Sequence, residues 1–201
     1  MSTGTLFIVA TPIGNLDDIS PRARAVLTSV DLIAAEDTRV TGRLLSHFGI
    51  KSRQIALHDH NEAQRAASLI AELQKGHSIA LVSDAGTPLI SDPGFRLTKA
   101  AHDAGITVSP VPGASAVVCA LSASGLPTDR FAYEGFLPAK RVARQKRLSE
   151  LETECRTMVF YESVHRISDT VVDAREILGG DRQAFIGREL TKLYEQCVAG
   201  D

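Results

Sequence analysis

The chain has no tryptophan, only three cysteines and no apolar run long enough to cross a membrane. Cys119, Cys155 and Cys197 lie far apart and belong to no CxxC pair or Cys/His cluster. This usage disfavours a disulfide framework and a structural zinc site, and it is typical of a reducing cytosol. The apolar run at residues 6–10 is too short for a secretion signal, so it predicts a buried strand. We therefore expect a cytoplasmic protein without a metal site.

The chain has little net charge, because its 22 Lys and Arg residues nearly balance its 24 Asp and Glu residues. The chain as a whole is therefore not a basic nucleic-acid binder, and any affinity for RNA must come from a local patch. Hydrophobic residues make up 44% of the sequence, which is an ordinary globular composition. A length of 201 residues suits one large domain or two small ones with a real core.

Short apolar runs alternate with helical stretches in the first half of the sequence. This alternation predicts right-handed βαβ units and an α/β domain with a mostly parallel sheet over residues 1–112. The predicted strands are residues 6–10, 32–35, 54–57, 79–82 and 108–111, and the predicted helices are residues 21–30, 41–48, 62–74 and 94–104.

The second half, residues 113–201, predicts a mixed α/β domain. A strand expected at residues 193–199 lacks an obvious closing partner, so we expect this domain to be incomplete and the natural chain to be longer. The other predicted strands are residues 130–133, 157–161 and 184–188, and the predicted helices are residues 116–123, 142–154 and 166–178.

A turn-rich segment, SDAGTPLISDPG at residues 83–94, follows a predicted buried strand. Connections in a compact domain usually need only two to six residues, so a longer loop here favours a pocket. Gly86 would let backbone amides approach a ligand, and Asp84 could accept a hydrogen bond from an ammonium or a ribose hydroxyl. The alternative is a rigid connector in which Asp92 caps the following helix.

Two shorter segments, TPIGNL at residues 11–16 and VPGASA at residues 111–116, also follow predicted strands. Ligands of open α/β sheets gather beyond the carboxyl ends of the strands, where both segments are expected to lie. Neither matches GxGxxG or a phosphate-binding loop, so dinucleotide and kinase functions lose support. A plain structural loop and a domain hinge remain the respective alternatives.

Two polar segments have an ordinary and a functional interpretation. Five cations within residues 140–147 make a local positive surface suited to phosphates, although a solvated helix face is the usual reason for such a run. The segment HDHN at residues 58–61 favours a helix-capping turn over a metal site, because it lacks partners at ligand spacing.

Six ordered segments, at residues 11–16, 35–39, 83–94, 133–138, 160–166 and 188–192, resemble the tetrapyrrole methylase superfamily. Among its branches, they are most similar to the one that methylates small-subunit ribosomal RNA. The resemblance implies two α/β domains, S-adenosylmethionine bound between them, and a homodimer. It also implies transfer of a methyl group to the 2′-hydroxyl of a cytidine in ribosomal RNA of the small subunit.

With this resemblance, three sets of site residues are expected. The cofactor set is Pro12, Asp84, Gly86, Thr87, Pro112, Gly113, Ala114, Ser115, Phe136 and Tyr161. The catalytic set is Glu36, Asp37, Arg39 and Lys192, with Glu36 or Asp37 as the candidate base. Glu189 is also expected to act in RNA binding or catalysis. The RNA-binding set is Asn15, Lys140, Arg141, Arg144, Lys146, Arg147, His165 and Arg166.

Three alternatives remain open for the function. The candidate catalytic residues could instead form a buried ion-pair network with Arg39 that has only a structural role. The acceptor could be a small tetrapyrrole, as in other branches of the superfamily. The chain could also be an RNA-binding or assembly module that binds no cofactor.

Overall fold

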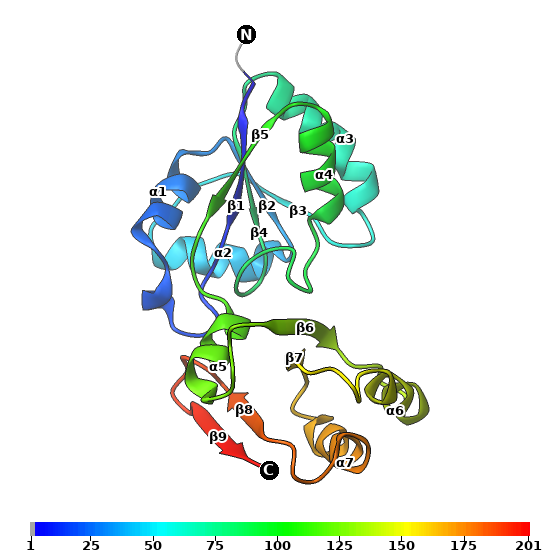
Figure 1. Cartoon of the computed structure of the whole chain (residues 1–201). Coiled ribbons are helices and arrows are strands. Elements are labelled where there is room, and N and C mark those ends of the chain that lie inside the picture. Colours follow the sequence, from blue (N-terminus) through cyan, green and yellow to red (C-terminus); the bar gives the residue numbers. More distant parts are fainter. Residues whose placement is uncertain (1–2) are drawn as a thin grey trace. The chain divides into compact units, whose positions relative to one another are not determined.

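The computed structural model describes residues 3–201, and its chain divides into two compact units between Ser115 and Ala116 (Figure 1). This division falls a few residues beyond the predicted boundary at residue 112. Each unit has its own sheet and its own helices. No helix among residues 3–201 is long and apolar enough to span a bilayer.

The first unit is built on a sheet of five parallel strands in the order β3-β2-β4-β1-β5. The central strands β2 and β4 are buried at every residue, as their continuous apolar sequences LIAA and IALV require in a sheet covered on both faces. The strands are β1 (Thr5–Val9), β2 (Leu32–Ala35), β3 (Gln54–Ala56), β4 (Ile79–Val82) and β5 (Thr107–Val111).

Helices cover both faces of this sheet (Figure 1). One apolar cluster joins the sheet to α1 (Pro21–Ser29) and α2 (Thr38–His47), and a second joins it to α3 (Glu62–Gln74) and α4 (Phe95–Asp103). Ser20 begins α1 as expected, since its hydroxyl accepts a hydrogen bond from the Ala23 amide at 3.0 Å. The first half of the molecule therefore has the predicted α/β architecture.

The start of α2 was predicted wrongly at residue 41, since the helix begins at Thr38. Asp37 has extended backbone geometry, and its carboxylate accepts a hydrogen bond from the Arg39 amide at 2.8 Å. An aspartate in this position satisfies one of the free amides of the first turn, so it defines the helix N-terminus. The correction matters because it attaches the segment Glu36–Arg39 to the edge of the sheet.

The connections that follow β1 and β4 leave the sheet in different directions. The connection after β1 leads through α1 towards β2 on one side, whereas the connection after β4 leads through α4 to β5 on the other. Neighbouring strands whose connections diverge in this way form a topological switch point, where open α/β sheets bind their ligands. The segment after β1, which includes the short helix η1 (Leu16–Asp18), and the segment after β4 both begin at this switch point.

The second unit is a mixed α/β arrangement of two small sheets. Strands β6 (Phe131–Phe136) and β7 (Thr157–Tyr161) are parallel, whereas β8 (Ala184–Arg188) and β9 (Gln196–Gly200) are antiparallel. The strand predicted at residues 130–133 is too short, because β6 continues through Phe136 after an irregularity between Tyr133 and Gly135. The helices of this unit are α5 (Ala116–Ser124), α6 (Arg141–Glu150) and α7 (Ile167–Leu178).

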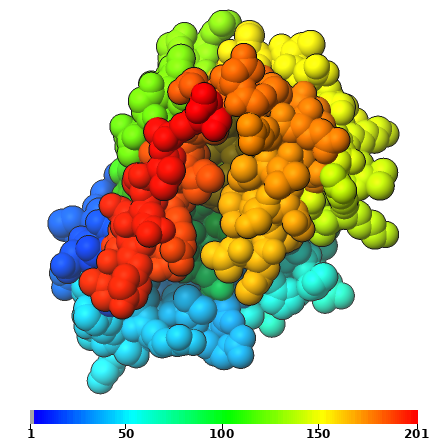
Figure 2. Space-filling view, turned by 90° about the horizontal axis from the view of Figure 1, so that it is seen from below, coloured from blue at the N-terminus to red at the C-terminus, as the bar shows by residue number. Residues whose placement is uncertain are grey.

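The final strand has a partner, contrary to the sequence-based expectation. All five residues of β9 pair with β8, from Gln196 opposite Arg188 to Gly200 opposite Ala184. Figure 2 shows this strand, in red, at the surface beside the orange β8, and every residue of β9 is exposed. The hairpin is closed by backbone pairing and by a hydrogen bond from the Arg188 guanidinium to the Gln196 side chain at 2.9 Å, and hydrophobic patterning reveals neither.

Candidate functional site

Three loops meet at the carboxyl edge of the first sheet. The backbone amides of Thr11 and Gly86 each donate to the other residue's carbonyl, at 2.9 and 3.1 Å, so the loops after β1 and β4 are joined. The Thr87 hydroxyl donates to the Ala114 carbonyl at 3.1 Å, which joins the loop after β5. A Cβ added at Gly113 would lie 2.9 Å from the Ala10 Cβ, so only glycine permits this approach. The three predicted loop motifs are therefore assembled at one place.

The loop over residues 83–94 has an unusual backbone. Leu89 and Ser91 have φ values of 75° and 65°, although neither is glycine. Left-handed conformations of this kind are disfavoured for residues with a Cβ and persist only where the surrounding structure imposes them. Leu89 is held by packing against the core, and Gly94 starts α4 at φ 129°. The loop is thus a constrained element, as its length and turn residues suggest.

Glu36 and Asp84 link the loops after β2 and β4 in both directions. The Asp84 amide donates to the Glu36 carboxylate at 3.2 Å, and the Asp37 amide donates to the Asp84 carboxylate at 3.0 Å. These bonds bring together residues nearly fifty positions apart. The candidate catalytic segment therefore lies beside the candidate cofactor loop, within a single unit of the fold.

Negative charge is concentrated at this edge. Burial raises the pKa of the Glu36 carboxyl above its ordinary value, and the nearby carboxylates of Asp92 and Asp84 act in the same direction. Burial likewise raises the pKa of Asp84 and of Asp92. Three acidic groups that are costly to ionise together make a site suited to a positively charged ligand.

Asp37 and Arg39 behave differently from Glu36. The Arg39 guanidinium donates to Asp37 at 2.6 Å, and the side-chain and backbone hydrogen bonds from Arg39 lower the pKa of Asp37 to about 2. Arg39 itself is exposed to solvent. The pair is therefore a surface ion pair at the start of α2 rather than the buried network considered as an alternative.

In the second unit, aromatic rings gather at the ends of the parallel strand pair. The Phe136 and Tyr161 rings lie 5.5 Å apart between centroids, and the Tyr133 and Tyr161 rings lie 5.2 Å apart. Phe136 is well exposed despite its size. Cofactor contacts of Phe136 and Tyr161 stay a prediction, because this geometry is internal to the second unit.

The basic run at residues 140–147 is largely neutralised within the second unit. Arg144 is buried and donates to Asp173 at 2.7 Å, which fastens α6 to α7. Arg141 also pairs with Asp173, and Arg147 pairs with Glu134 at 2.5 Å. Arg144 was expected among the RNA contacts, but its burial leaves it no surface to offer a phosphate. The predicted patch reduces to the exposed Lys140 and Lys146 and the solvent-facing parts of Arg141 and Arg147.

The remaining predicted residues occupy loops of both units. Arg166 donates to the Leu137 carbonyl and to Glu162 at 2.7 and 2.8 Å, so it supports the loop around it, whereas His165 is exposed. Lys192 lies in the exposed turn between β8 and β9, and Asn15 caps η1 by accepting from the Asp17 amide at 3.1 Å. Roles in RNA binding or catalysis stay predictions for these residues.

Sequence reasoning assigned no chemical role to Asp92 and Ser83, although both belong to the acidic edge. Asp92 was considered only as a helix cap, but it is half-buried near Glu36 and Asp84. Ser83 is buried and hydrogen-bonded to Asp92. Their place within the turn-rich segment was the available signal, because both flank its glycines and prolines.

Fold and site together define an α/β protein with joined, acidic loops at the carboxyl edge of a parallel sheet, the edge at which open α/β sheets bind their ligands. Residues 5–201 match a family described as tetrapyrrole (corrin/porphyrin) methylases, and the chain belongs to this family. S-adenosylmethionine is the methyl donor in this family, so the predicted cofactor and the predicted methyltransferase class are confirmed.

Close relatives carry one name, ribosomal RNA small subunit methyltransferase I. The protein from Escherichia coli O157:H7 is 59% identical over 194 residues, which are 96% of this chain and 68% of the relative. The protein from Xylella fastidiosa strain Temecula1 is 58% identical over 100% of this chain and 74% of the relative. The one from Synechocystis is 55% identical over 98% and 71%, respectively.

Solved structures with the same fold are methyltransferases of lower identity. The methyltransferase CobJ superposes with a TM-score of 0.71 at 20% identity, over 98% of this chain and 86% of that one. Uroporphyrin-III-C-methyltransferase from Thermus thermophilus superposes with a TM-score of 0.62 at 22% identity, over 98% and 84%. At these identities the likeness confirms the predicted fold and nothing finer.

The acidic edge fits the cofactor chemically. S-adenosylmethionine carries a sulfonium and an ammonium, and Glu36, Asp84 and Asp92 supply negative charge. Gly86 also lets the joined loops approach each other closely, since a Cβ at this position would lie 3.3 Å from the Ile13 side chain. The donor set thus suits a cationic adenosyl compound better than a nucleoside polyphosphate.

Proposed function

We propose that this chain transfers a methyl group from S-adenosylmethionine to the 2′-hydroxyl of a cytidine in small-subunit ribosomal RNA. The observation that carries the RNA acceptor is the name shared by relatives that are 55–59% identical over nearly the whole chain. The joined loops and the acidic edge support the location of the cofactor. The sugar position and the base follow from the resemblance alone, so they are part of the proposal.

S-adenosylmethionine supplies an activated methyl group, and the chain must position the acceptor and take up its proton. A neutral ribose hydroxyl is a weak nucleophile, so a base of suitable pKa assists the reaction. Glu36 suits this role better than Asp37, because burial raises the pKa of Glu36 whereas Arg39 holds the pKa of Asp37 at about 2. A carboxylate with so low a pKa has little tendency to accept a proton.

Asp84 has a separate role in the proposal. Its carboxylate accepts the Asp37 amide, and its own amide donates to Glu36. Asp84 therefore holds the proposed base in place and adds negative charge for the cofactor. Asp84→Asn should weaken cofactor binding, whereas Glu36→Gln should reduce the rate of transfer by far more than it weakens cofactor binding.

The test is methyl transfer to unmodified small ribosomal subunits, followed by mass-spectrometric mapping of the modified nucleotide. We expect one added methyl group on a cytidine ribose for the unaltered chain, and a loss of about 100-fold or more for Glu36→Gln. Methylation of a precorrin but not of ribosomal RNA would favour the tetrapyrrole alternative. Absence of S-adenosylmethionine binding in calorimetry would overturn the assigned site.

A further inference from the structure

A row of basic side chains runs along α2. Arg39, Arg43 and His47 are four residues apart and all exposed, and the exposed Lys51 follows four residues after the helix ends. Four residues of helix advance about 6 Å, so the three helical members span about 12 Å on one side of α2. Figure 2 shows the light-blue residues of this region at the molecular surface.

This row differs from the basic run of α6 in its lack of carboxylate partners. Among the ion pairs formed by residues 3–201, none involves Arg43, His47 or Lys51, and Arg39 alone is paired, with Asp37. The three arginines of α6, in contrast, are all ion-paired. Cations without partners are available to bind phosphates and to release counterions.

One end of the row lies at the acidic edge. Asp37, which caps α2, donates its amide to Asp84 at 3.0 Å, and Arg39 follows in the first helical turn. A polyanion lying along α2 would therefore reach the proposed base and cofactor loop at this end.

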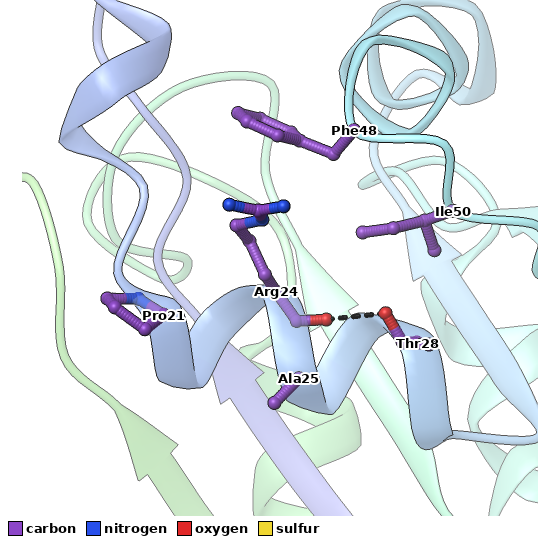
Figure 3. A pocket seen from close by; sticks show the side chains of 6 residues that line it. All are labelled: Pro21, Arg24, Ala25, Thr28, Phe48 and Ile50. Carbon is purple, nitrogen blue, oxygen red and sulfur yellow. Dashed lines mark hydrogen bonds between the residues drawn. The ribbon is translucent and has the colours of Figure 1, made fainter.

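The other end of the row lies at a small pocket of about 250 Å³ between α1 and the segment after α2 (Figure 3). The Arg24 guanidinium lies over the Phe48 ring at 4.7 Å, and the His47 ring meets the same ring edge-on at 4.7 Å. Figure 3 shows Arg24 reaching between Phe48 and the α1 helix, with Ile50 lining the same hollow. Planar guanidinium and aromatic groups of this kind are the surfaces on which unpaired bases stack. The pocket is smaller than the ~300–1,000 Å³ of drug-sized ligand sites, which suits a single flat ring.

We propose that α2 and this pocket bind the single-stranded RNA segment next to the methylated nucleotide. The phosphates follow Arg39, Arg43, His47 and Lys51, and one base stacks against the Arg24–Phe48 pair. This inference rests on the proposed function, because it requires an RNA substrate. It assigns the main RNA contact to α2 of the first unit in place of the ion-paired helix α6.

The test compares two charge-neutralised variants of the whole chain, Arg43→Gln/Lys51→Gln and the matched control Lys75→Gln/Lys99→Gln. In the control, Lys75 lies at the end of α3 and Lys99 lies in α4, and each forms an exposed surface ion pair. Both helices cover the face of the sheet opposite to α2. Binding of unmodified small-subunit ribosomal RNA is measured at several salt concentrations. The α2 variant should bind roughly 10-fold more weakly at physiological salt, and its salt slope should fall by about 1.4, or 0.7 per lost phosphate contact. The control should keep the slope of the unaltered chain.

A third variant, Arg24→Gln, tests the pocket. It should weaken RNA binding by about 5- to 10-fold without a comparable change in S-adenosylmethionine binding. An unchanged salt slope in the α2 variant, or equal losses in variant and control, would overturn the proposal while RNA methylation by the unaltered chain still stood. If the unaltered chain bound S-adenosylmethionine but neither bound nor methylated the RNA, the proposed function and this surface would both be wrong.

Discussion

Replacing Gly94 by alanine should destabilise the first unit much more than the same change at Gly105. The two glycines flank α4, and both have positive φ, 129° at Gly94 and 66° at Gly105. The left-handed backbone should therefore cost about 1–2 kcal/mol at either position. A Cβ at Gly94 would also lie 2.5 Å from the Leu81 Cδ2 and 3.3 Å from the Leu89 Cδ1, whereas a Cβ at Gly105 would meet nothing within 4 Å.

The difference between the two variants isolates the cost of the clash. Leu81 is fully buried in the core, so it cannot move aside freely, and overpacking of this kind costs about 1–3 kcal/mol. We expect Gly94→Ala to lower the free energy of unfolding by about 2–5 kcal/mol and Gly105→Ala by about 1–2 kcal/mol. Urea denaturation followed by circular dichroism measures both, provided that the m-value stays constant.

A double variant tests the cause. Leu81→Ala removes the atom that the new Cβ would strike, so Leu81→Ala/Gly94→Ala should be less destabilised than the sum of the single changes by about 1–3 kcal/mol. Strict additivity, or equal destabilisation at Gly94 and Gly105, would refute the argument that the loop over residues 83–94 is seated tightly on the core.

Two further changes probe the site at single residues. Asp37→Asn should reduce the loss of stability between pH 4 and pH 2. Arg39 lowers the pKa of Asp37 to about 2, so the ionised group stabilises the fold above its ordinary pKa of 3.8 and loses this effect as the pH falls towards 2. Acid titration followed by circular dichroism would show the same profile for both proteins if the ion pair contributed nothing. Thr87→Val should weaken S-adenosylmethionine binding by about 1 kcal/mol, because it removes the donor to the Ala114 carbonyl that joins two of the loops; unaltered affinity in calorimetry would show that this bond does not shape the site.

The strands of the first unit could be predicted closely because their sequences are short apolar runs between turn residues. The bounds of β2 and β4 were predicted correctly from the apolar runs LIAA and IALV, since a strand buried on both faces needs no polar alternation. The start of α2 was missed because the search followed apolar spacing, whereas the helix is defined by the cap at Asp37. Helix α6 ends at Glu150 although the prediction extended it to residue 154.

The partners of charged residues could not be predicted, because they come from distant parts of the chain. Arg144 pairs with Asp173 from another helix, and no local pattern distinguishes it from the exposed Lys146. The reciprocal bonds of Glu36 and Asp84 likewise depend on the order β2-β4 in the sheet, which alternation of strands and helices does not fix. Sequence motifs predicted which loops meet at the sheet edge, and only the fold showed which of their charges pair with one another.

If the cofactor binds at the acidic edge as proposed, its affinity should depend on pH. Burial raises the pKa values of Glu36, Asp84 and Asp92, so part of their negative charge is lost as the pH falls towards their raised values. A cation bound beside them favours the ionised form, which lowers the pKa values and releases protons. The affinity for S-adenosylmethionine should therefore fall on acidification at a pH above the ordinary value of 4.5 for a glutamate, and binding should release protons near that pH. Calorimetry in two buffers of different ionisation enthalpy measures this release, and Asp84→Asn should reduce it. If the affinity were the same on both sides of this pH range, the carboxylates would not be the groups that recognise the cation.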